Sequence, residues 1–274
     1  MNITSDALLT DLYELTMAQA YLAQGMTDIA VFEFFVRKLP PQRNFFMAAG
    51  LEQVLSYLEA FQFSDADIAW LDQTGGFRPA SLNALRAMRF TGEVHAMPEG
   101  SLFFPHEPIL RITAPLPQAQ LVETRVMNLL NFQTMVASKA CRSVLVAGDK
   151  PLIDFGLRRA HGAEAGLLAA RAAYLAGLAG TSNVSAGARF GIPIYGTMAH
   201  SFVQAHLDEA KAFIHIAETQ PRNVVLLIDT YDTEAAAEKV VSLAGRLNAR
   251  GISIHGVRLD SGDLADHARK VRHI

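Results

Sequence analysis

A chain of 274 residues, half of them hydrophobic, is long enough to build one large domain or two ordinary ones around a sizeable core. The formal net charge is only −3 and the Lys and Arg residues are scattered, which excludes the basic footprint of a protein that binds nucleic acid or an acidic membrane. The single cysteine, Cys141, excludes an internal disulfide and a cysteine-based metal site. Because no apolar run is long enough to span a bilayer and the N-terminus lacks a signal-peptide pattern, we expect a cytoplasmic protein.

The chain begins with the pattern of a helix followed by a strand. Residues 5–24 carry apolar side chains at helical spacing and are followed by Gly25, which predicts an amphipathic helix that ends there. Residues 29–36 predict a strand. Tyr13 lies off the apolar stripe of the helix, so it is either a half-exposed surface residue or an aromatic ring offered to a partner chain or a ligand. The residue pattern by itself favours the surface residue.

Brief strands and then a long helical pattern follow. Gly and Pro interrupt short apolar runs at hairpin-like intervals in residues 91–115, which predicts a small β-rich module. From Gln118 to Ala147, apolar residues recur at helical spacing. Since this stretch is long for a globular helix, we predict two helices that meet near Asn131.

The change of pattern near Pro115–Gln118 predicts a boundary between an N-terminal α/β domain, residues 1–117, and a second domain, residues 118–274. In the second domain, apolar runs alternate with helical stretches, as in parallel strands joined by crossover helices. The runs begin near Pro151, Leu178, Ile192, Val224 and Ile252. The helices are expected at 163–177, 207–220 and 233–249 and from Ser261 onward. Five strands do not close a (β/α) barrel of about eight, so we predict an incomplete barrel.

Polar residues follow each apolar run, and the carboxyl ends of parallel strands share one edge of a sheet or barrel. These residues are Asp154, Arg158, Arg159, Thr181, Ser182, Asn183, Thr197, His200, Asp229, Asp232, Arg258, Asp260, Ser261 and Asp263. Hydroxyls, backbone N–H groups and arginines suit phosphate, and carboxylates suit Mg²⁺ or ribose hydroxyls. The edge is therefore a candidate active site for a phosphorylated, ribose-bearing substrate.

His200 is the histidine of this edge. A lone histidine after a strand is either a buried, hydrogen-bonded residue or a catalyst, and its place beside arginines and aspartates favours the catalyst. His206 follows six residues later, which is not the spacing of two metal ligands on a helix, so no protein metal site is predicted.

Ordered motifs run from one end of the chain to the other. They are LLTDLYELTMAQAYL, VFEFFVRKLP, LVETRVMNLLNFQT, DFGLRRAHG, GTSNV, GTMAHSFVQAH, LLIDTYDT and VRLDSGDL. In these motifs the chain resembles the nicotinate phosphoribosyltransferase family. The resemblance implies a type II phosphoribosyltransferase, in which an N-terminal α/β domain meets an irregular α/β barrel and two subunits commonly form a homodimer.

The resemblance also implies a reaction and its participants. Nicotinate and phosphoribosyl pyrophosphate form nicotinate mononucleotide and pyrophosphate, with coupled hydrolysis of ATP and with Mg²⁺, in the salvage synthesis of NAD. His200 would be phosphorylated by ATP. Tyr13, from the other subunit, and Phe155 would sandwich the pyridine ring, with Arg158 near its carboxylate.

The remaining site residues are implied in the same way. Asp229, Arg258 and Asp260 would line the ribose–phosphate side, with the two aspartates in catalytic roles and Thr197 binding substrate. Ser182 would favour nicotinate, because relatives that use nicotinamide carry an acidic residue there, which would repel the carboxylate of nicotinate. Quinolinate, the substrate of decarboxylating relatives, is disfavoured because their basic residues for two carboxylates are not evident.

Family members continue past the equivalent of Ile274, through further strands and a glycine-rich turn that holds a phosphate. We therefore expect a fragment, or a chain completed by another polypeptide. Two alternatives to the enzyme stay open: a non-catalytic remnant that pairs with a full-length relative, and a different (β/α) enzyme acting on a phosphorylated sugar.

Overall fold

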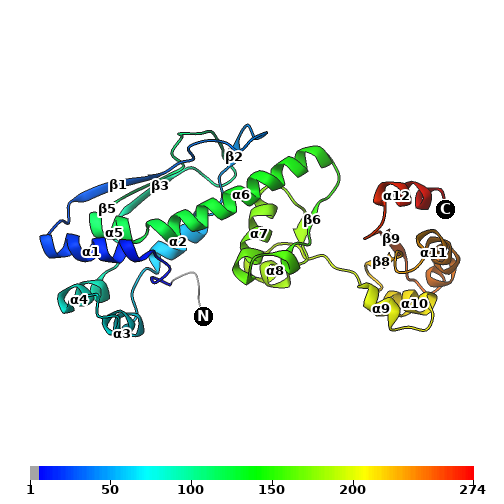
Figure 1. Ribbon diagram of the computed structural model, residues 1–274. Coiled ribbons are helices and arrows are strands. Elements are labelled where there is room, and N and C mark those ends of the chain that lie inside the picture. The colour runs from blue at the N-terminus through cyan, green and yellow to red at the C-terminus, as the bar shows by residue number, and fades with distance from the viewer. Residues whose placement is uncertain (1–5) are drawn as a thin grey trace. The chain divides into compact units, whose positions relative to one another are not determined.

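The computed structural model describes residues 6–274, which form two compact units. The N-terminal unit ends at Tyr195, and the C-terminal unit runs from Gly196 to Ile274 (Figure 1). Both contain helices and strands, which confirms the α/β class. The boundary expected near Pro115–Gln118 lies inside the N-terminal unit and, as a division between domains, stays a prediction. Ser5, the expected first residue of the first helix, lies outside the described residues.

The N-terminal unit contains most of the secondary structure. Its helices are α1 (Leu12–Gln24), α2 (Leu51–Glu59), α3 (Asp65–Gln73), α4 (Pro79–Ala87), α5 (Leu116–Leu121), α6 (Glu123–Ala147), the 3₁₀ helix η2 (Leu157–Arg159), α7 (Ala163–Leu175) and α8 (Val184–Phe190). Its strands are β1 (Ile29–Phe34), β2 (Phe46–Met47), β3 (Glu93–Ala96), β4 (Leu102–Phe103), β5 (Leu110–Pro115), β6 (Ile153–Asp154) and β7 (Gly180–Thr181).

Three of these strands form an antiparallel sheet in the order β1–β5–β3, with Ile29 opposite Pro115 and Val94 opposite Ile112. The inner face of β5 is buried in a core that includes Tyr57, Phe61 and Leu129. The strand expected at 29–36 and the β-rich module expected at 91–115 are both confirmed. Gly25 ends α1 in a left-handed conformation, as its sequence predicts.

The prediction of two helices meeting near Asn131 is wrong. Helix α6 runs unbroken from Glu123 to Ala147, and the interruption lies earlier, at Val122, between α5 and α6. Asn131 is exposed, but it does not interrupt the buried face of the helix. Leu130 before it and Ala137 after it are both buried on that face. The continuous burial of one face stabilises a length that intrinsic propensity alone would leave marginal.

The rest of the N-terminal unit consists of short parallel strands and covering helices. β6 pairs with β7 in parallel, and Thr181 of β7 forms a bridge with Ile194. The strands expected near Pro151 and Leu178 are thus confirmed, although each is only two residues long. Near Ile192 the structure has an isolated bridge at Ile194 in place of a strand.

The C-terminal unit has two parallel strands and four helices. They are β8 (Val224–Leu227), β9 (Ile254–Arg258), α9 (His200–Gln204), α10 (Glu209–Thr219), α11 (Thr233–Asn248) and α12 (Leu264–His273). Its core is made by residues such as Phe213, Leu226 and Leu247, all fully buried. α12 starts at Leu264 rather than Ser261, because the Asp263 carboxylate accepts the N–H groups of Ala265 and Asp266 as its N-cap.

Two glycines of the N-terminal unit differ in how closely the backbone at each approaches other elements. Gly50 and Gly25 both have positive φ, at +108° and +67°. A Cβ on Gly50 would lie 2.8 Å from the carbonyl oxygen of Leu129 in α6, whereas a Cβ on Gly25 would meet nothing within 4 Å.

We therefore expect Gly25→Ala to cost about 1–2 kcal/mol of unfolding free energy through backbone strain alone. Gly50→Ala is expected to cost about 1–3 kcal/mol more, because α2 must move away from α6. Urea unfolding of the two variants measures the difference, and the lost entropy of the unfolded chain is the same in both. Equal losses would show that α2 and α6 do not approach as closely as described.

Candidate active site

The Asp229 carboxylate is the centre of a hydrogen-bond network in the C-terminal unit. Asp229 follows β8, and its side chain is only 2% exposed. Its Oδ1 lies 3.2 Å from Nε2 of His200, the first residue of α9. Its Oδ2 accepts hydrogen bonds from the amide of Asp260 at 2.9 Å and from the hydroxyl of Ser261 at 2.7 Å. A buried carboxylate thus joins the segments that follow β8 and β9 to the start of α9.

Arg258, the last residue of β9, extends this network. Its guanidinium donates to the hydroxyl of Thr197 and to the carbonyl of Met198, both at 3.1 Å. It also forms an ion pair of 2.9 Å with Asp260. The structure therefore brings together five of the residues expected from the sequence, namely Thr197, His200, Asp229, Arg258 and Asp260.

The network determines which nitrogen of His200 is available for chemistry. Burial by itself raises the pKa of Asp229, but hydrogen bonds from Ser261, from the amide of Asp260 and from His200 outweigh it and hold this pKa below its ordinary value. Asp229 is therefore an acceptor at neutral pH, and Nε2 of His200 must carry the hydrogen. The lone pair on Nδ1 is left as a nucleophile, on a side chain that is 37% exposed.

A second group of expected residues lies at the carboxyl ends of β6 and β7 in the N-terminal unit. Asp154 ends β6, and its carboxylate accepts hydrogen bonds from the hydroxyl of Thr181 at 2.8 Å and the amide of Gly156 at 2.9 Å. The amide of Ser182 donates to the carbonyl of Asp154 at 2.8 Å. Phe155 and Ser182 therefore follow neighbouring parallel strands at the same edge.

The other expected residues of this group come from separate elements. Arg158 is exposed and lies in η2, one turn after β6. Tyr13 lies on α1, where it is 46% exposed. The structure describes one chain, so a sandwich of Phe155 with a Tyr13 from another subunit stays a prediction.

Three polar residues around these groups were not assigned a role from the sequence. Ser261 and Thr181 were recognised only as polar residues after strands, and their bonds to Asp229 and Asp154 are visible only in the fold. Glu14 was not recognised at all, although it is completely buried. Local spacing gave no signal for it, because two of its hydrogen bonds come from Thr124 at the start of α6, 110 residues later.

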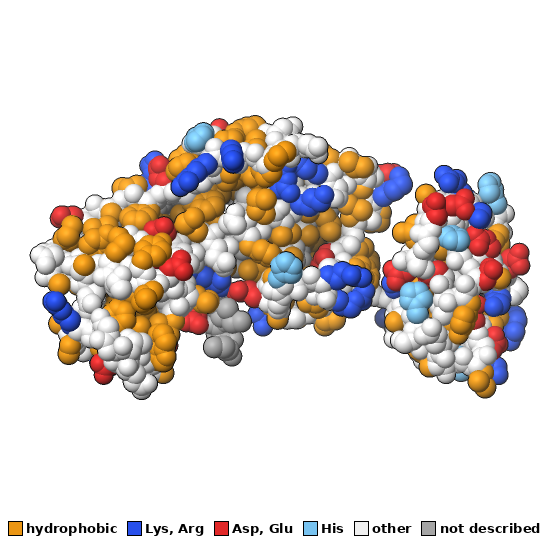
Figure 2. All heavy atoms as spheres, viewed as in Figure 1, with side chains coloured by type: hydrophobic (Ala, Val, Ile, Leu, Met, Phe, Trp, Pro, Cys, Tyr) orange, Lys and Arg blue, Asp and Glu red, His pale blue; other side chains and the backbone are white. Residues whose placement is uncertain are grey.

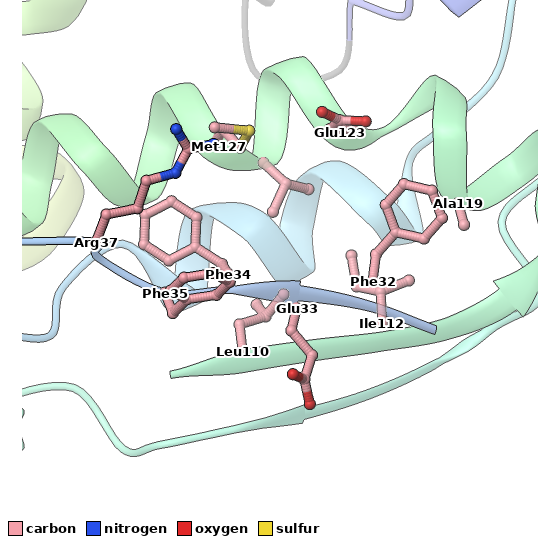
Figure 3. Close-up of a pocket in the computed structure, with 11 residues that line it drawn as sticks. Phe32, Glu33, Phe34, Phe35, Arg37, Leu110, Ile112, Ala119, Glu123 and Met127 are labelled. Carbon is pink, nitrogen blue, oxygen red and sulfur yellow. The ribbon is translucent and has the colours of Figure 1, made fainter. Parts of the chain in front are cut away.

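A groove of the N-terminal unit, lined mostly by apolar side chains, shares no residue with either group. It has a volume of about 280 Å³ and runs between β1 and α6, lined by Phe32, Phe34 and Met127, with Arg37 and Glu123 near its rim (Figure 3). On the visible face of the C-terminal unit, acidic, basic and histidine side chains are intermixed (Figure 2).

Within residues 6–274, no helix is both long and apolar enough to cross a membrane. The same residues contain no group of three or more His, Cys, Asp or Glu side chains placed to hold a metal ion.

Family models and known proteins give a consistent comparison. The model of the nicotinate phosphoribosyltransferase (NAPRTase) N-terminal domain matches residues 8–131, and that of the nicotinate phosphoribosyltransferase (NAPRTase) family matches residues 151–274. A Mycobacterium tuberculosis protein, nicotinate phosphoribosyltransferase pncB2, is 51% identical over 97% of this chain, and a Bacillus subtilis nicotinate phosphoribosyltransferase is 44% identical over 97%. The chain spans 57% and 54% of the length of these two relatives.

Solved structures agree with the sequence matches. The crystal structure of human nicotinic acid phosphoribosyltransferase is similar with a TM-score of 0.89 and 35% identity, over 96% of this chain and 63% of that one. Nicotinate-nucleotide pyrophosphorylase from Pyrococcus furiosus has a TM-score of 0.79 at 24% identity, over 98% of this chain and 62% of that one, which supports the fold alone. The fold is thus that of the type II phosphoribosyltransferases.

The Asp229 network predicts a defined dependence of stability on pH. Since the folded-state pKa of Asp229 lies below its ordinary value of 3.8, its contribution is present above that pH and is lost as the pH falls through the folded-state pKa. Asp229→Asn is expected to lose about 1–3 kcal/mol of unfolding free energy at pH 7. The difference in unfolding free energy between Asp229→Asn and the parent chain should become smaller below about pH 4, because the parent chain loses the same contribution there.

Chemical unfolding from pH 7 to pH 3 measures this gap. Glu238→Gln, which removes an exposed carboxylate of α11, is the matched control and should follow the parent chain throughout. A gap that stays constant down to pH 3 would contradict the lowered pKa.

Proposed function

Because this chain belongs to the nicotinate phosphoribosyltransferase family, we propose that its two groups of strand-end residues serve the transfer of a phosphoribosyl group to nicotinate. The products are nicotinate mononucleotide and pyrophosphate, with ATP hydrolysis coupled to the transfer, in NAD salvage in the cytoplasm. The observation that carries this proposal is the His200–Asp229–Ser261 network, which prepares one histidine nitrogen as a nucleophile.

In the proposed coupling step, Nδ1 of His200 attacks the γ-phosphorus of ATP. The N–P bond forms as the bond to the bridging oxygen breaks, and ADP leaves with that electron pair. The imidazole becomes positively charged when its second nitrogen is substituted, and the ionised Asp229 at 3.2 Å stabilises this charge. Water later takes the phosphoryl group, which restores the free histidine.

In the proposed transfer step, the ring nitrogen of nicotinate forms a bond to the anomeric carbon of phosphoribosyl pyrophosphate. The bond from that carbon to pyrophosphate breaks, and positive charge develops on the sugar. Arg258, held by Thr197 and by the Met198 carbonyl, presents a preorganised guanidinium to the leaving pyrophosphate. Asp260 and Asp229 supply the nearby negative charge that stabilises the sugar cation.

The residues fit a Mg²⁺ that is shared with the substrate rather than held by the protein alone. The Asp229 carboxylate is already occupied by three donors, whereas Asp260 is 43% exposed and could offer an oxygen. Mg²⁺ usually takes one or two carboxylates together with substrate phosphates, and it would neutralise charge on the pyrophosphate.

The pyridine side is assigned to Phe155, Tyr13, Arg158 and Ser182. Phe155 and Tyr13 offer half-exposed aromatic rings, Arg158 a guanidinium for the carboxylate, and Ser182 a neutral hydroxyl. Tyr13 would come from the other subunit of a homodimer, so the proposal includes a second copy of this chain.

The substrate proposal is tested by turnover of nicotinate against nicotinamide. We expect nicotinate to be the better substrate, and Ser182→Asp to lower its kcat/KM by about tenfold or more, since a second negative charge faces its carboxylate. Ser185→Asp, three residues further on and exposed in α8, is the control for added charge. The assay uses this chain and, in parallel, this chain joined to the C-terminal part of the Bacillus subtilis relative. Faster turnover of nicotinamide would refute the assignment, and absence of product in both forms would refute the activity.

The role of His200 is tested with ATP labelled at the γ-phosphate. His200→Ala is expected to lose acid-labile phosphorylation and ATP stimulation but to keep slow, ATP-independent formation of nicotinate mononucleotide, because the phosphohistidine lies outside the bond being made. His206→Ala should remain phosphorylated. A folded His200→Ala protein with no residual transfer would place His200 in the glycosyl step instead.

A further inference from the structure

Glu14 is a completely buried carboxylate that the proposed mechanism does not use. It lies on α1 with 0% of its surface exposed. Burial raises its pKa, although hydrogen bonds from Thr10 and Thr124 act in the opposite direction. A buried carboxylate is costly unless its oxygens are well satisfied, so its hydrogen-bond partners indicate what it does.

One set of partners belongs to the start of α6. Glu14 Oε1 accepts from the amide of Thr124 at 3.0 Å and from the hydroxyl of Thr124 at 2.8 Å. Thr124 is the second residue of α6, and the helix has no side-chain cap of its own at Val122. Glu14 therefore caps α6 from a distant element and fixes one point of α1 to the longest helix of the chain.

The other partners lie on α1 and just before it. The hydroxyl of Thr10 donates to Oε2 of Glu14. The hydroxyl of Tyr13 donates to Oε1 at 3.3 Å. Burial, then the carboxylates of Glu123 and Glu14, raise the pKa of Tyr13 against the opposite effect of a hydrogen bond with the Thr124 side chain, so its phenol stays a protonated donor at neutral pH. The hydroxyl of Tyr13 is thus tethered while much of its ring is exposed.

We propose that Glu14 is a positioning residue for Tyr13. Fixed at the start of α6, its carboxylate holds the Tyr13 hydroxyl and sets the direction of the exposed ring that would stack on nicotinate. The proposal rests on the proposed function for the stacking role of Tyr13, whereas the tether itself does not depend on that function. Holding the ring beforehand reduces the entropy lost when the pyridine binds.

A role as a structural cap and a role as a positioning residue predict different results, and three variants distinguish them. Tyr13→Phe removes the tether and leaves the cap on Thr124 in place. Glu14→Ala removes both, and Glu14→Gln keeps an acceptor of the same shape. Asp11→Ala is the matched control, because Asp11 also accepts from the Thr124 hydroxyl, at 3.1 Å, but has no bond to Tyr13.

The tether is measured first on the chain of residues 1–274 with ring-labelled tyrosine, using NMR signals assigned through Tyr13→Phe. We expect Glu14→Ala to shift the Tyr13 ring signal and average its ring environment, Glu14→Gln to restore most of the parent signal, and Asp11→Ala to leave it unchanged. A Tyr13 signal that is the same in Glu14→Ala and in the parent would overturn the proposal.

The consequence for binding is measured in the turnover assay described above. Glu14→Ala and Tyr13→Phe should each raise KM for nicotinate about fivefold, the worth of one hydrogen bond, with kcat and KM for phosphoribosyl pyrophosphate nearly unchanged. In the double variant the two effects should not add, because they remove the same bond. Additive effects, or an equal change in Asp11→Ala, would reduce Glu14 to a structural cap.

The two proposals can fail separately. If Tyr13→Ala leaves KM for nicotinate unchanged while the NMR signals respond to Glu14→Ala, the stacking role is wrong and the tether stands. If Tyr13→Ala raises KM but Tyr13→Phe does not, the stacking role stands and the positioning by Glu14 is wrong. Tyr13→Phe keeps the second outcome measurable even where Glu14→Ala is too unstable to fold.

Discussion

The buried Asp229 carboxylate is the interaction on which the C-terminal unit depends. Shielding a carboxylate from solvent costs free energy unless each oxygen accepts hydrogen bonds. The donors to Asp229 come from α9 and from the segment after β9. Satisfying this one group therefore determines where His200, Asp260 and Ser261 lie. The same bonds determine the tautomer of His200, because the acceptor Asp229 requires the hydrogen on Nε2 and leaves the lone pair on Nδ1.

Both units use a carboxylate at the ends of parallel strands. Asp154 accepts hydrogen bonds from Gly156 after β6 and from Thr181 at the end of β7, as Asp229 does from Asp260 and Ser261 after β9. In each case a carboxylate orders a loop whose backbone would otherwise have few partners. Phe155, directly after β6, and His200, the first residue of α9, are thereby held in definite positions.

Much of this could be predicted from the residues. The strands near Leu178, Val224 and Ile252 and the helices 163–177 and 233–249 follow from apolar runs and helical spacing that local chemistry enforces. The grouping of Asp229, Arg258 and Asp260 follows because the parallel strands β8 and β9 end at one edge. Thr197 and His200 join this group through hydrogen bonds to Arg258 and Asp229. The break expected near Asn131 failed because helix length was judged from intrinsic propensity, whereas α6 is stabilised by packing along one face.

The sequence by itself determined the α/β class, the order of the elements and the family, since these depend on residue types and spacings along the chain. Only the tertiary structure decided which hydrogen bonds the polar residues make. Ser261 and Glu14 are unremarkable in a local pattern, but one contacts Asp229 and the other Thr124, residues 32 and 110 positions away. Such distant side chains become buried and hydrogen-bonded only when packing removes water from around them. The spacing of residues along the chain does not encode these contacts.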